Sequence, residues 1–344
     1  LRCILDLRSL AQERVGNQEF AERDLVRLLE LTRDERTRTR LTIRLVGRIL
    51  LPLAARSQGK GRLDRALSLV LRAGERVAPA RETEDEELRL AALETSGRCC
   101  QRAYQLTIKQ AQAALDVPLT RETLAQANEL ILKLVFKPAQ DPSRPLLAAE
   151  LEQLLAASDL PAGRILRLQE AIGRAREWVA GAFRDYGAAL RPREGFAAFQ
   201  GISGLLVRGG RRDEAAMISR LKLHAGASPY LGRAAERLAR IHLDGGRREE
   251  AIQVLERWLA GQGPETLITE YGLLPEPAQD AMALLLDLYI VGGKGREAWR
   301  LIDRVVKHWQ VHRGRLKRNW NFYMGMADRL AGGEPARIEE RLAR

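Results

Sequence analysis

Residues Gly246-Arg-Arg-Glu-Glu-Ala251 decide the fold, because a close copy precedes them at Gly210-Arg-Arg-Asp-Glu-Ala215. A third copy follows at Gly293-Lys-Gly-Arg-Glu-Ala298. The shared pattern is glycine, a basic residue, two variable residues, an acid and alanine. Each copy lies between two segments whose apolar residues recur at helical spacing. A pattern that recurs in register in this way predicts a chain built from repeated pairs of helices.

Each residue type in the pattern suits a turn between two helices. Glycine ends the first helix in a left-handed conformation. The acid falls in the first turn of the second helix, where the helix dipole favours it, and alanine lets the two helices approach closely. Weaker copies occur at Gly16-Asn-Gln-Glu-Phe-Ala21 and Gly61-Arg-Leu-Asp-Arg-Ala66. One pair cannot bury its apolar face alone, so the pairs are expected to stack on their neighbours.

The composition supports the same fold class. The chain has 344 residues and is 45% hydrophobic but only 5% aromatic, and Leu, Ala, Arg and Glu, which dominate it, favour helices. Strand-like alternation is scarce. We therefore predict an all-α fold, an α-solenoid of stacked antiparallel helix pairs. Because residues 138–145 contain three prolines, the predicted domains are an N-terminal helical array (1–137), connector helices (138–192) and C-terminal repeats (193–344).

The C-terminal repeats resemble the tetratricopeptide and pentatricopeptide superfamily. Residues 285–303, Leu-Leu-Asp-Leu-Tyr-Ile-Val-Gly-Gly-Lys-Gly-Arg-Glu-Ala-Trp-Arg-Leu-Ile-Asp, look much like a pentatricopeptide unit. Residues 241–259 fit either family. The resemblance is specific for residues 195–310 and weak elsewhere, and it implies paired antiparallel helices stacked as a right-handed superhelix.

The two families imply different partners. Pentatricopeptide arrays read single-stranded RNA one base per repeat, whereas tetratricopeptide arrays more often bind protein segments in a groove. Alignment of the three units places Gln200, Glu236 and Ala283 at the main base-reading position. The pentatricopeptide family prefers Asn, Asp, Ser or Thr there, so the resemblance does not extend to base-by-base reading of RNA.

A strong positive charge raises the possibility of a polyanionic partner. The net charge is +12, which suits RNA or a ribosome, although a base-composition bias that enriches Arg, Ala and Gly together would have the same effect. Arg36, Arg40, Arg44 and Arg48 stand at strict i, i+4 spacing and would line one face of a helix. This stripe is either a track for phosphates or an acidic protein, or a set of ion pairs to adjacent helices, for which residues 84–87 supply acids.

A second basic patch, which contains aromatic residues, lies between residues 304 and 327. Basic side chains among aromatic rings suit phosphate contacts combined with base stacking, but the aromatic residues would equally form the core of the last helix pair. The predicted binding residues of this patch are Lys307, Arg313, Arg315, Lys317, Arg318 and Trp320.

No sequence motif indicates catalysis, a cofactor or a metal. His308 and His312 have a spacing that suits a shared metal, but no third ligand accompanies them. Cys3, Cys99 and Cys100 form no Cys-x-x-Cys pair, which favours a reducing compartment over a zinc site or a disulfide framework. No P-loop and no apolar run of membrane-spanning length occur. We therefore expect no enzyme activity, no small-molecule substrate and no membrane insertion.

These features predict a noncatalytic scaffold associated with RNA or the ribosome. The chain begins at Leu1 inside an expected helix, and the removal or omission of a targeting peptide or of a disordered extension would account for this start. The expected location is therefore the mitochondrial matrix or that of another organelle, and otherwise the cytoplasm. The alternative is a protein-binding adaptor of tetratricopeptide type, or an accessory subunit of a large complex, without RNA contact.

Overall fold

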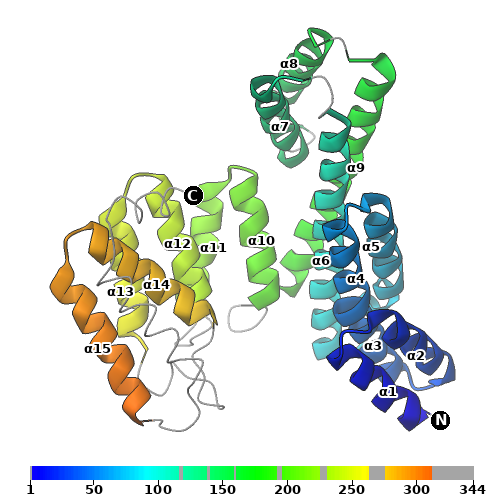
Figure 1. Ribbon diagram of the computed structural model, residues 1–344, viewed down its shortest axis with the longest axis horizontal. Helices are drawn as coiled ribbons and strands as arrows, with labels where there is room; N and C mark the ends of the chain where they lie inside the picture. The colour runs from blue at the N-terminus through cyan, green and yellow to red at the C-terminus, as the bar shows by residue number, and fades with distance from the viewer. Residues whose placement is uncertain are drawn as a thin grey trace. The chain divides into compact units, whose positions relative to one another are not determined.

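The structure of the chain, a computed structural model, consists of helices joined by turns and short connections in the residues that it describes (Figure 1). These residues are 2–115, 119–137, 140–158, 160–191, 196–224, 231–262 and 276–311. The predicted all-α fold is confirmed, and stacked helix pairs make it an α-solenoid. Within the described ranges, no helix combines the length and the apolarity needed to cross a lipid bilayer.

All five predicted glycine–alanine stretches form the same kind of turn, which we call an elbow. The elbow glycines have φ angles between 67° and 76°, in the left-handed region that glycine tolerates best. The elbow alanines are all completely buried. The glycines are Gly16, Gly61, Gly210, Gly246 and Gly293, and the alanines are Ala21, Ala66, Ala215, Ala251 and Ala298.

Hydrogen bonds around Gly246 explain how an elbow ends one helix and begins the next. The Gly246 amide donates to the carbonyl of Leu243 at 2.9 Å, and the Arg247 amide donates to that of His242 at 2.9 Å. This pair of bonds is the Schellman motif, which satisfies carbonyls at the end of a helix. The Ala251 amide then donates to the Arg247 carbonyl at 3.2 Å and opens the second helix. The same pattern recurs at Gly16, Gly61 and Gly293.

The chain divides into two compact units, of which unit 1 comprises residues 1–191 and 197–210. Its core includes Leu25, Leu45, Ile49 and Leu50, none of which is exposed. Its first helices are α1 (Arg2–Arg14), α2 (Gln18–Leu31), α3 (Glu35–Arg44), the π-helical segment η1 (Leu45–Leu50), α4 (Leu51–Gly59), α5 (Leu63–Val77) and the 3₁₀ turn η2 (Pro79–Glu82). They are followed by α6 (Glu86–Leu115), α7 (Arg121–Phe136), α8 (Arg144–Ala156), α9 (Ala162–Ala189) and α10 (Phe196–Arg208).

Two glycines allow the long helices of unit 1 to pack around a single tyrosine. Tyr186 on α9 is 1% exposed, and its hydroxyl donates to the side-chain oxygen of Gln101 on α6 at 2.8 Å. A Cβ atom at Gly97 would lie 2.6 Å from the Tyr186 ring, and one at Gly201 on α10 would lie 2.2 Å from it. Both distances are too short for carbon atoms in contact, so α6 and α10 need glycine where they meet this ring.

Unit 2 comprises residues 192–196 and 211–344. Its described core includes Ala251, Leu255, Met282 and Leu286, all completely buried. Its helices are α11 (Arg212–His224), α12 (Gly232–Asp244), α13 (Arg248–Ala260), α14 (Glu276–Val291) and α15 (Gly295–Val311). The elbows at Gly246 and Gly293 join α12 to α13 and α14 to α15. The three-part division expected from the sequence partitions the chain differently and stays a prediction.

Candidate functional site

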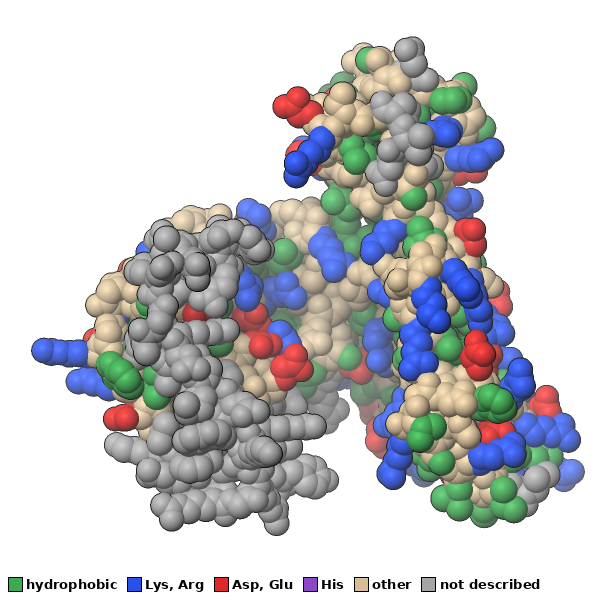
Figure 2. Space-filling view, viewed as in Figure 1, with side chains coloured by type: hydrophobic (Ala, Val, Ile, Leu, Met, Phe, Trp, Pro, Cys, Tyr) green, Lys and Arg blue, Asp and Glu red, His purple; other side chains and the backbone are tan. Residues whose placement is uncertain are grey.

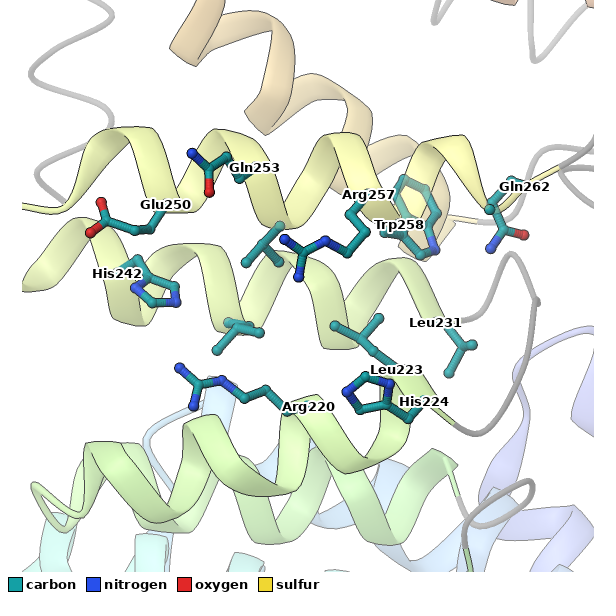
Figure 3. Close-up of a pocket in the computed structure, with 13 residues that line it drawn as sticks. Arg220, Leu223, His224, Leu231, His242, Glu250, Gln253, Arg257, Trp258 and Gln262 are labelled. Atoms are coloured by element: carbon teal, nitrogen blue, oxygen red, sulfur yellow. The ribbon is translucent and has the colours of Figure 1, made fainter.

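A groove in unit 2 runs along three consecutive helices, α11, α12 and α13, and contains a cavity of about 530 Å³. This volume lies in the range usual for ligand pockets, about 300–1,000 Å³. Side chains that enter the groove come from one face of each helix (Figure 3). Helices α11 and α13, each the second helix after an elbow, flank α12. We call this feature the α11–α13 groove.

The floor of the α11–α13 groove is apolar. Leu231 and Leu238 come from the start and middle of α12, and both are buried. Val254 and Trp258 stand one turn apart on α13, and Leu223 faces them from α11. These residues recur at helical spacing, as expected for packed helices. Part of their apolar surface faces the cavity instead of packing against a neighbouring side chain.

Two buried nitrogen atoms at the groove have no hydrogen-bond partner among the described residues. They are Nδ1 of His242, which is 7% exposed, and Nε1 of Trp258, which is 6% exposed. The tryptophan nitrogen is a donor only, so it needs an acceptor. A buried polar group left without a partner costs about 1–3 kcal/mol. A bound ligand that supplies an acceptor would remove part of this cost.

The rim of the groove is predominantly cationic. Arg220 projects into it from α11 and Arg257 from α13, on opposite sides of α12 (Figure 3). Neither guanidinium has an ion pair among the described residues. Glu250 is the one carboxylate among the lining residues. The groove therefore combines an apolar floor with two cations that have room to bind an anion.

The pKa of His242 reflects the positive charge around the α11–α13 groove. Burial lowers the pKa of its imidazole, and the nearby Arg247 and Arg220 lower that pKa further, while Glu250 raises it. The lowered pKa favours the neutral imidazole at pH 7. A neutral imidazole offers one donor and one acceptor, so His242 adds hydrogen-bonding capacity to the groove without adding charge.

The opposite face of α12, which packs against α14, has balanced charges. Glu236 is 8% exposed and accepts from Arg233 and Arg240, each at 3.0 Å. Arg233 also pairs with Asp280 on α14 at 2.9 Å. The arginines of this face are therefore neutralised within the fold. This contrast makes the cations of the α11–α13 groove more significant, since unit 2 does pair arginines where acids are in reach.

The predicted stripe on α3 and η1 divides into paired and unpaired arginines. Arg36 pairs with Asp85, its Nε lying 2.7 Å from Oδ2. Arg44 is only 16% exposed and reaches back to α1, where it pairs with Asp6 at 2.6 Å and with Glu13 at 2.6 Å. These two arginines follow the second of the two interpretations, ion pairs to adjacent helices, and Asp85 is one of the expected acids.

Arg40 and Arg48 are exposed and have no ion pair in the described part of the chain. Arg40 lies near Asp34 and Asp85 and contributes to lowering the pKa of both carboxyls, although hydrogen bonds from Thr37 and Leu88 are the larger causes. The π-helix over residues 45–50 closes wider turns than an α-helix does, so Arg48 departs from the straight line that strict α-helical spacing implies. A phosphate-binding role for the stripe stays a prediction.

The face of unit 1 seen in Figure 2 shows Lys and Arg side chains scattered among acids over α1–α5. Exposed ion pairs account for part of this mixture. Arg65 pairs with Glu19 at 2.9 Å, and Arg72 pairs with Glu22 at 2.7 Å, each joining α5 to α2. Part of the positive charge of the chain therefore stabilises contacts between helices.

The second basic patch lies largely outside the described residues. Arg313, Arg315, Lys317, Arg318 and Trp320 follow the last described residue, and the side chain of Lys307 on α15 is not described either. The same holds for the histidine pair, His308 and His312. Within the described ranges, no group of three His, Cys, Asp or Glu side chains is placed to hold a metal ion.

None of the residues that line the α11–α13 groove is among the binding residues predicted from the sequence. The signal available was weak: His242 and Trp258 are polar-tipped residues on the buried faces of amphipathic helices, which normally indicates core packing. Elbow spacing predicts that α11, α12 and α13 are neighbours. It does not predict that their facing side chains leave a cavity, because this depends on how far apart the helices pack.

These observations define a helical-repeat protein with an amphiphilic groove. No protein-family model matches the chain, and no curated protein matches it. Among solved structures, it is similar to the nearly identical TPR-like repeats of a Podosopora anserina kinesin light chain, with a TM-score of 0.37 and 17% identity over 79% of this chain and 99% of that one.

Proposed function

We propose that this chain is a noncatalytic helical-repeat scaffold that binds a partner protein through the α11–α13 groove. The observation that carries the proposal is a cavity of about 530 Å³ lined by buried nitrogens of His242 and Trp258 that have no hydrogen-bond partner among the described residues. An apolar floor with a few polar groups at fixed positions is the usual composition of a binding pocket. Rigid helices position these groups, which limits the entropy lost when a ligand binds.

The test fills the groove without disturbing its walls. Val254 is half-buried and faces the cavity, so Val254→Phe should place a ring inside it. Peptides selected from a random display library on the wild-type protein should lose most of their affinity for this variant. The matched control is Ala260→Phe, because Ala260 is exposed on the same helix and adds the same ring elsewhere.

Two results would contradict the proposal. In the first, the selected peptides bind Val254→Phe and Ala260→Phe equally well, which would locate protein binding on another surface. The other is failure of the library to enrich any peptide on the wild-type protein. Circular dichroism and thermal denaturation of Val254→Phe establish that any loss of binding arises in a folded protein.

A second candidate is association with RNA, as expected for a scaffold of a ribonucleoprotein or ribosome. The observation in its favour is that Arg40 and Arg48 are exposed cations in a chain with a net charge of +12. Phosphate contacts release condensed counterions, so affinity falls as salt rises. We expect Arg40→Gln combined with Arg48→Gln to reduce the slope of log affinity against log salt by about 1.4 for single-stranded RNA, because each lost contact removes about 0.7.

The control for this test removes two exposed charges elsewhere in unit 1. Arg121→Gln combined with Arg174→Gln lowers the net charge equally but leaves α3 and η1 unchanged. An equal reduction of the slope by both pairs would show that only the total charge matters. An unchanged slope with the first pair would exclude the stripe and direct attention to Arg313–Arg318.

Residence in the mitochondrial matrix, or in that of another organelle, belongs to this second candidate. Imaging of the tagged full-length protein tests it. Staining confined to the cytoplasm would remove the support that a ribosome-associated role takes from an organelle.

A further inference from the structure

We propose that the partner of the α11–α13 groove is an acidic peptide segment, in which an aspartate or glutamate directly precedes a large apolar residue. The carboxylate binds Arg220 and Arg257, and the apolar side chain enters the cavity above Leu238 and Trp258. This inference rests on the proposed function and specifies the chemistry of the ligand.

The acidic component follows from the arginines of the rim. Arg220 on α11 and Arg257 on α13 approach the groove from opposite sides (Figure 3), and neither has an ion pair in the described ranges. Two like charges facing one cavity repel each other, and an anion between them removes the repulsion. A carboxylate suits this position, because its two oxygens can accept from the fork of a guanidinium and form short, charge-assisted hydrogen bonds.

The apolar component follows from the floor. Leu223, Leu231, Leu238 and Val254 line the cavity, and their side chains contain no polar atom. A small anion such as phosphate would leave this surface in contact with water. A leucine, isoleucine or phenylalanine side chain next to the bound carboxylate would cover it and gain the free energy of burying apolar surface.

The peptide backbone accounts for the remaining polar groups. Nε1 of Trp258 is a buried donor without a partner among the described residues, and Nδ1 of His242 is likewise unpartnered. A peptide carries carbonyl acceptors and amide donors within one residue of its side chains. An acid–apolar dipeptide within a chain can therefore pair with the cations, cover the apolar floor and hydrogen-bond to the buried nitrogens at the same time.

The single acid of the rim limits how the peptide binds. Glu250 stands at the start of α13, one turn from Gln253. It would repel a second carboxylate placed over the N-terminal end of α13, so an unbroken run of acids fits the groove less well than one acid beside an apolar residue. RNA fits less well again, because its phosphates recur at every nucleotide and would meet the same repulsion from Glu250.

Four fluorescein-labelled synthetic peptides test the proposal by anisotropy. They share a background of glycine, serine and alanine and differ at one central pair, which is Asp-Leu, Asn-Leu, Asp-Ala or Asp-Asp. We expect the Asp-Leu peptide to bind about tenfold more tightly than each of the others, because each of the others lacks either the charge-assisted hydrogen bonds of the aspartate or the buried apolar side chain.

Substitutions link this preference to the arginines. Arg257→Gln should remove most of the discrimination between Asp-Leu and Asn-Leu while leaving the discrimination between Asp-Leu and Asp-Ala. The matched control is Arg300→Gln, because Arg300 is exposed on α15 and outside the groove. It should change neither ratio.

The outcomes separate this inference from the proposed function. Equal binding of the Asp-Leu and Asn-Leu peptides, with loss in the Val254→Phe variant, would overturn the acidic ligand but keep a protein-binding groove. Decanoate also joins a carboxylate to an alkyl chain, and its binding can be followed by the displacement of an environment-sensitive apolar dye. If decanoate displaced the dye from the wild-type protein but not from Arg257→Gln, and no peptide bound, the site would be one for free fatty acids. Both proposals would then fail.

Discussion

Glycine at the third C-terminal elbow is required for its backbone conformation and not for space. Gly293 has a φ of 67°, and a Cβ atom there would meet no atom within 4 Å. Gly293→Ala should therefore destabilise unit 2 by about 1–2 kcal/mol, the cost of the left-handed conformation for a residue with a side chain. Urea denaturation followed by circular dichroism measures the difference.

A control lies two residues further along the chain. Gly295 opens α15, has no positive φ, and also has no atom within 4 Å of an added Cβ. Gly295→Ala should leave stability unchanged or raise it by up to about 1 kcal/mol, because alanine loses less backbone entropy on folding. If both variants lost the same stability, the φ of Gly293 would not be the cause.

The three cysteines should differ sharply in reactivity. Burial raises the pKa of Cys99 to about 12 and that of Cys100 to about 11, so almost none of either thiol is ionised at pH 8. Thiolate is the reactive form. Since Cys3 is exposed, Ellman's reagent should titrate one thiol quickly in the native protein and the other two only after unfolding. Rapid reaction of a folded Cys3→Ser variant would contradict the burial of Cys99 and the partial burial of Cys100 on α6.

At the residue scale, the sequence predicts backbone roles better than side-chain partners. Gly246 and Ala251 could be assigned because a left-handed turn and a close helix crossing each admit few residue types. Arg44 could not, because any helix within reach can supply a carboxylate to a long side chain. Its partners Asp6 and Glu13 lie on α1, and nothing in the i, i+4 spacing of the arginines identifies that helix.

At the element scale, the elbow alanines determine how closely paired helices pack. Ala251 is completely buried in the core of unit 2, so Ala251→Leu should force α13 away from its neighbours at a cost of about 1–3 kcal/mol. Ala260→Leu on the exposed end of the same helix should change stability by less than about 0.5 kcal/mol. Identical melting of the two variants would show that Ala251 faces solvent.

The contact between α1 and α3 depends on Arg44. Its guanidinium donates to Glu13 and Asp6, and Glu13 is only 11% exposed. Arg44→Gln would leave a largely buried carboxylate without its cation, and we expect a loss of about 1–3 kcal/mol in the stability of unit 1. Arg40→Gln, four residues earlier and exposed, should cost less than about 0.5 kcal/mol. Denaturant midpoints of the two variants measure the difference, and equal midpoints would contradict a structural role for Arg44.

The π-helical segment shows what periodicity misses within an element. Apolar residues at 45, 46, 49 and 50 fit an α-helical stripe, and the structure buries all four. The segment is nevertheless π-helical, and the Leu51 amide donates to the carbonyl of Val46. One wider turn between α3 and α4 leaves the same residues buried, so burial patterns alone cannot distinguish the two kinds of helix.

At the scale of the whole molecule, the repeat architecture was predictable and the groove was not. Five elbows recur, each with a glycine in the left-handed conformation, and stacking follows from the apolar faces of the helices that they join. The α11–α13 groove exists because the facing side chains of the three helices do not fill the space between them. The spacing of His242 and Trp258 in the sequence is that of ordinary core residues and does not indicate this cavity. A cavity arises from three-dimensional fit, which a linear pattern does not encode.

The two compact units should unfold as separate thermal transitions. The core around Leu25, Leu45 and Ile49 belongs to unit 1, and that around Leu255 and Met282 belongs to unit 2, and these clusters of described residues share no member. Repeat proteins are stabilised by contacts between neighbours, so distant repeats need not unfold together. Differential scanning calorimetry of the wild-type protein should therefore require at least two transitions, and two-state analysis should fail.

Two substitutions assign the transitions. Leu25→Ala removes a completely buried side chain from unit 1, at a cost of about 2–5 kcal/mol, and should lower the Tm of one transition. Ala251→Leu should lower the Tm of the other, because overpacking strains only the core of unit 2. The double variant should lower the Tm of each transition by the same amount as the corresponding single variant, since the two sites share no partner. If either single variant shifted the whole thermogram, the chain would unfold as one cooperative array and the division into units would have no thermodynamic meaning.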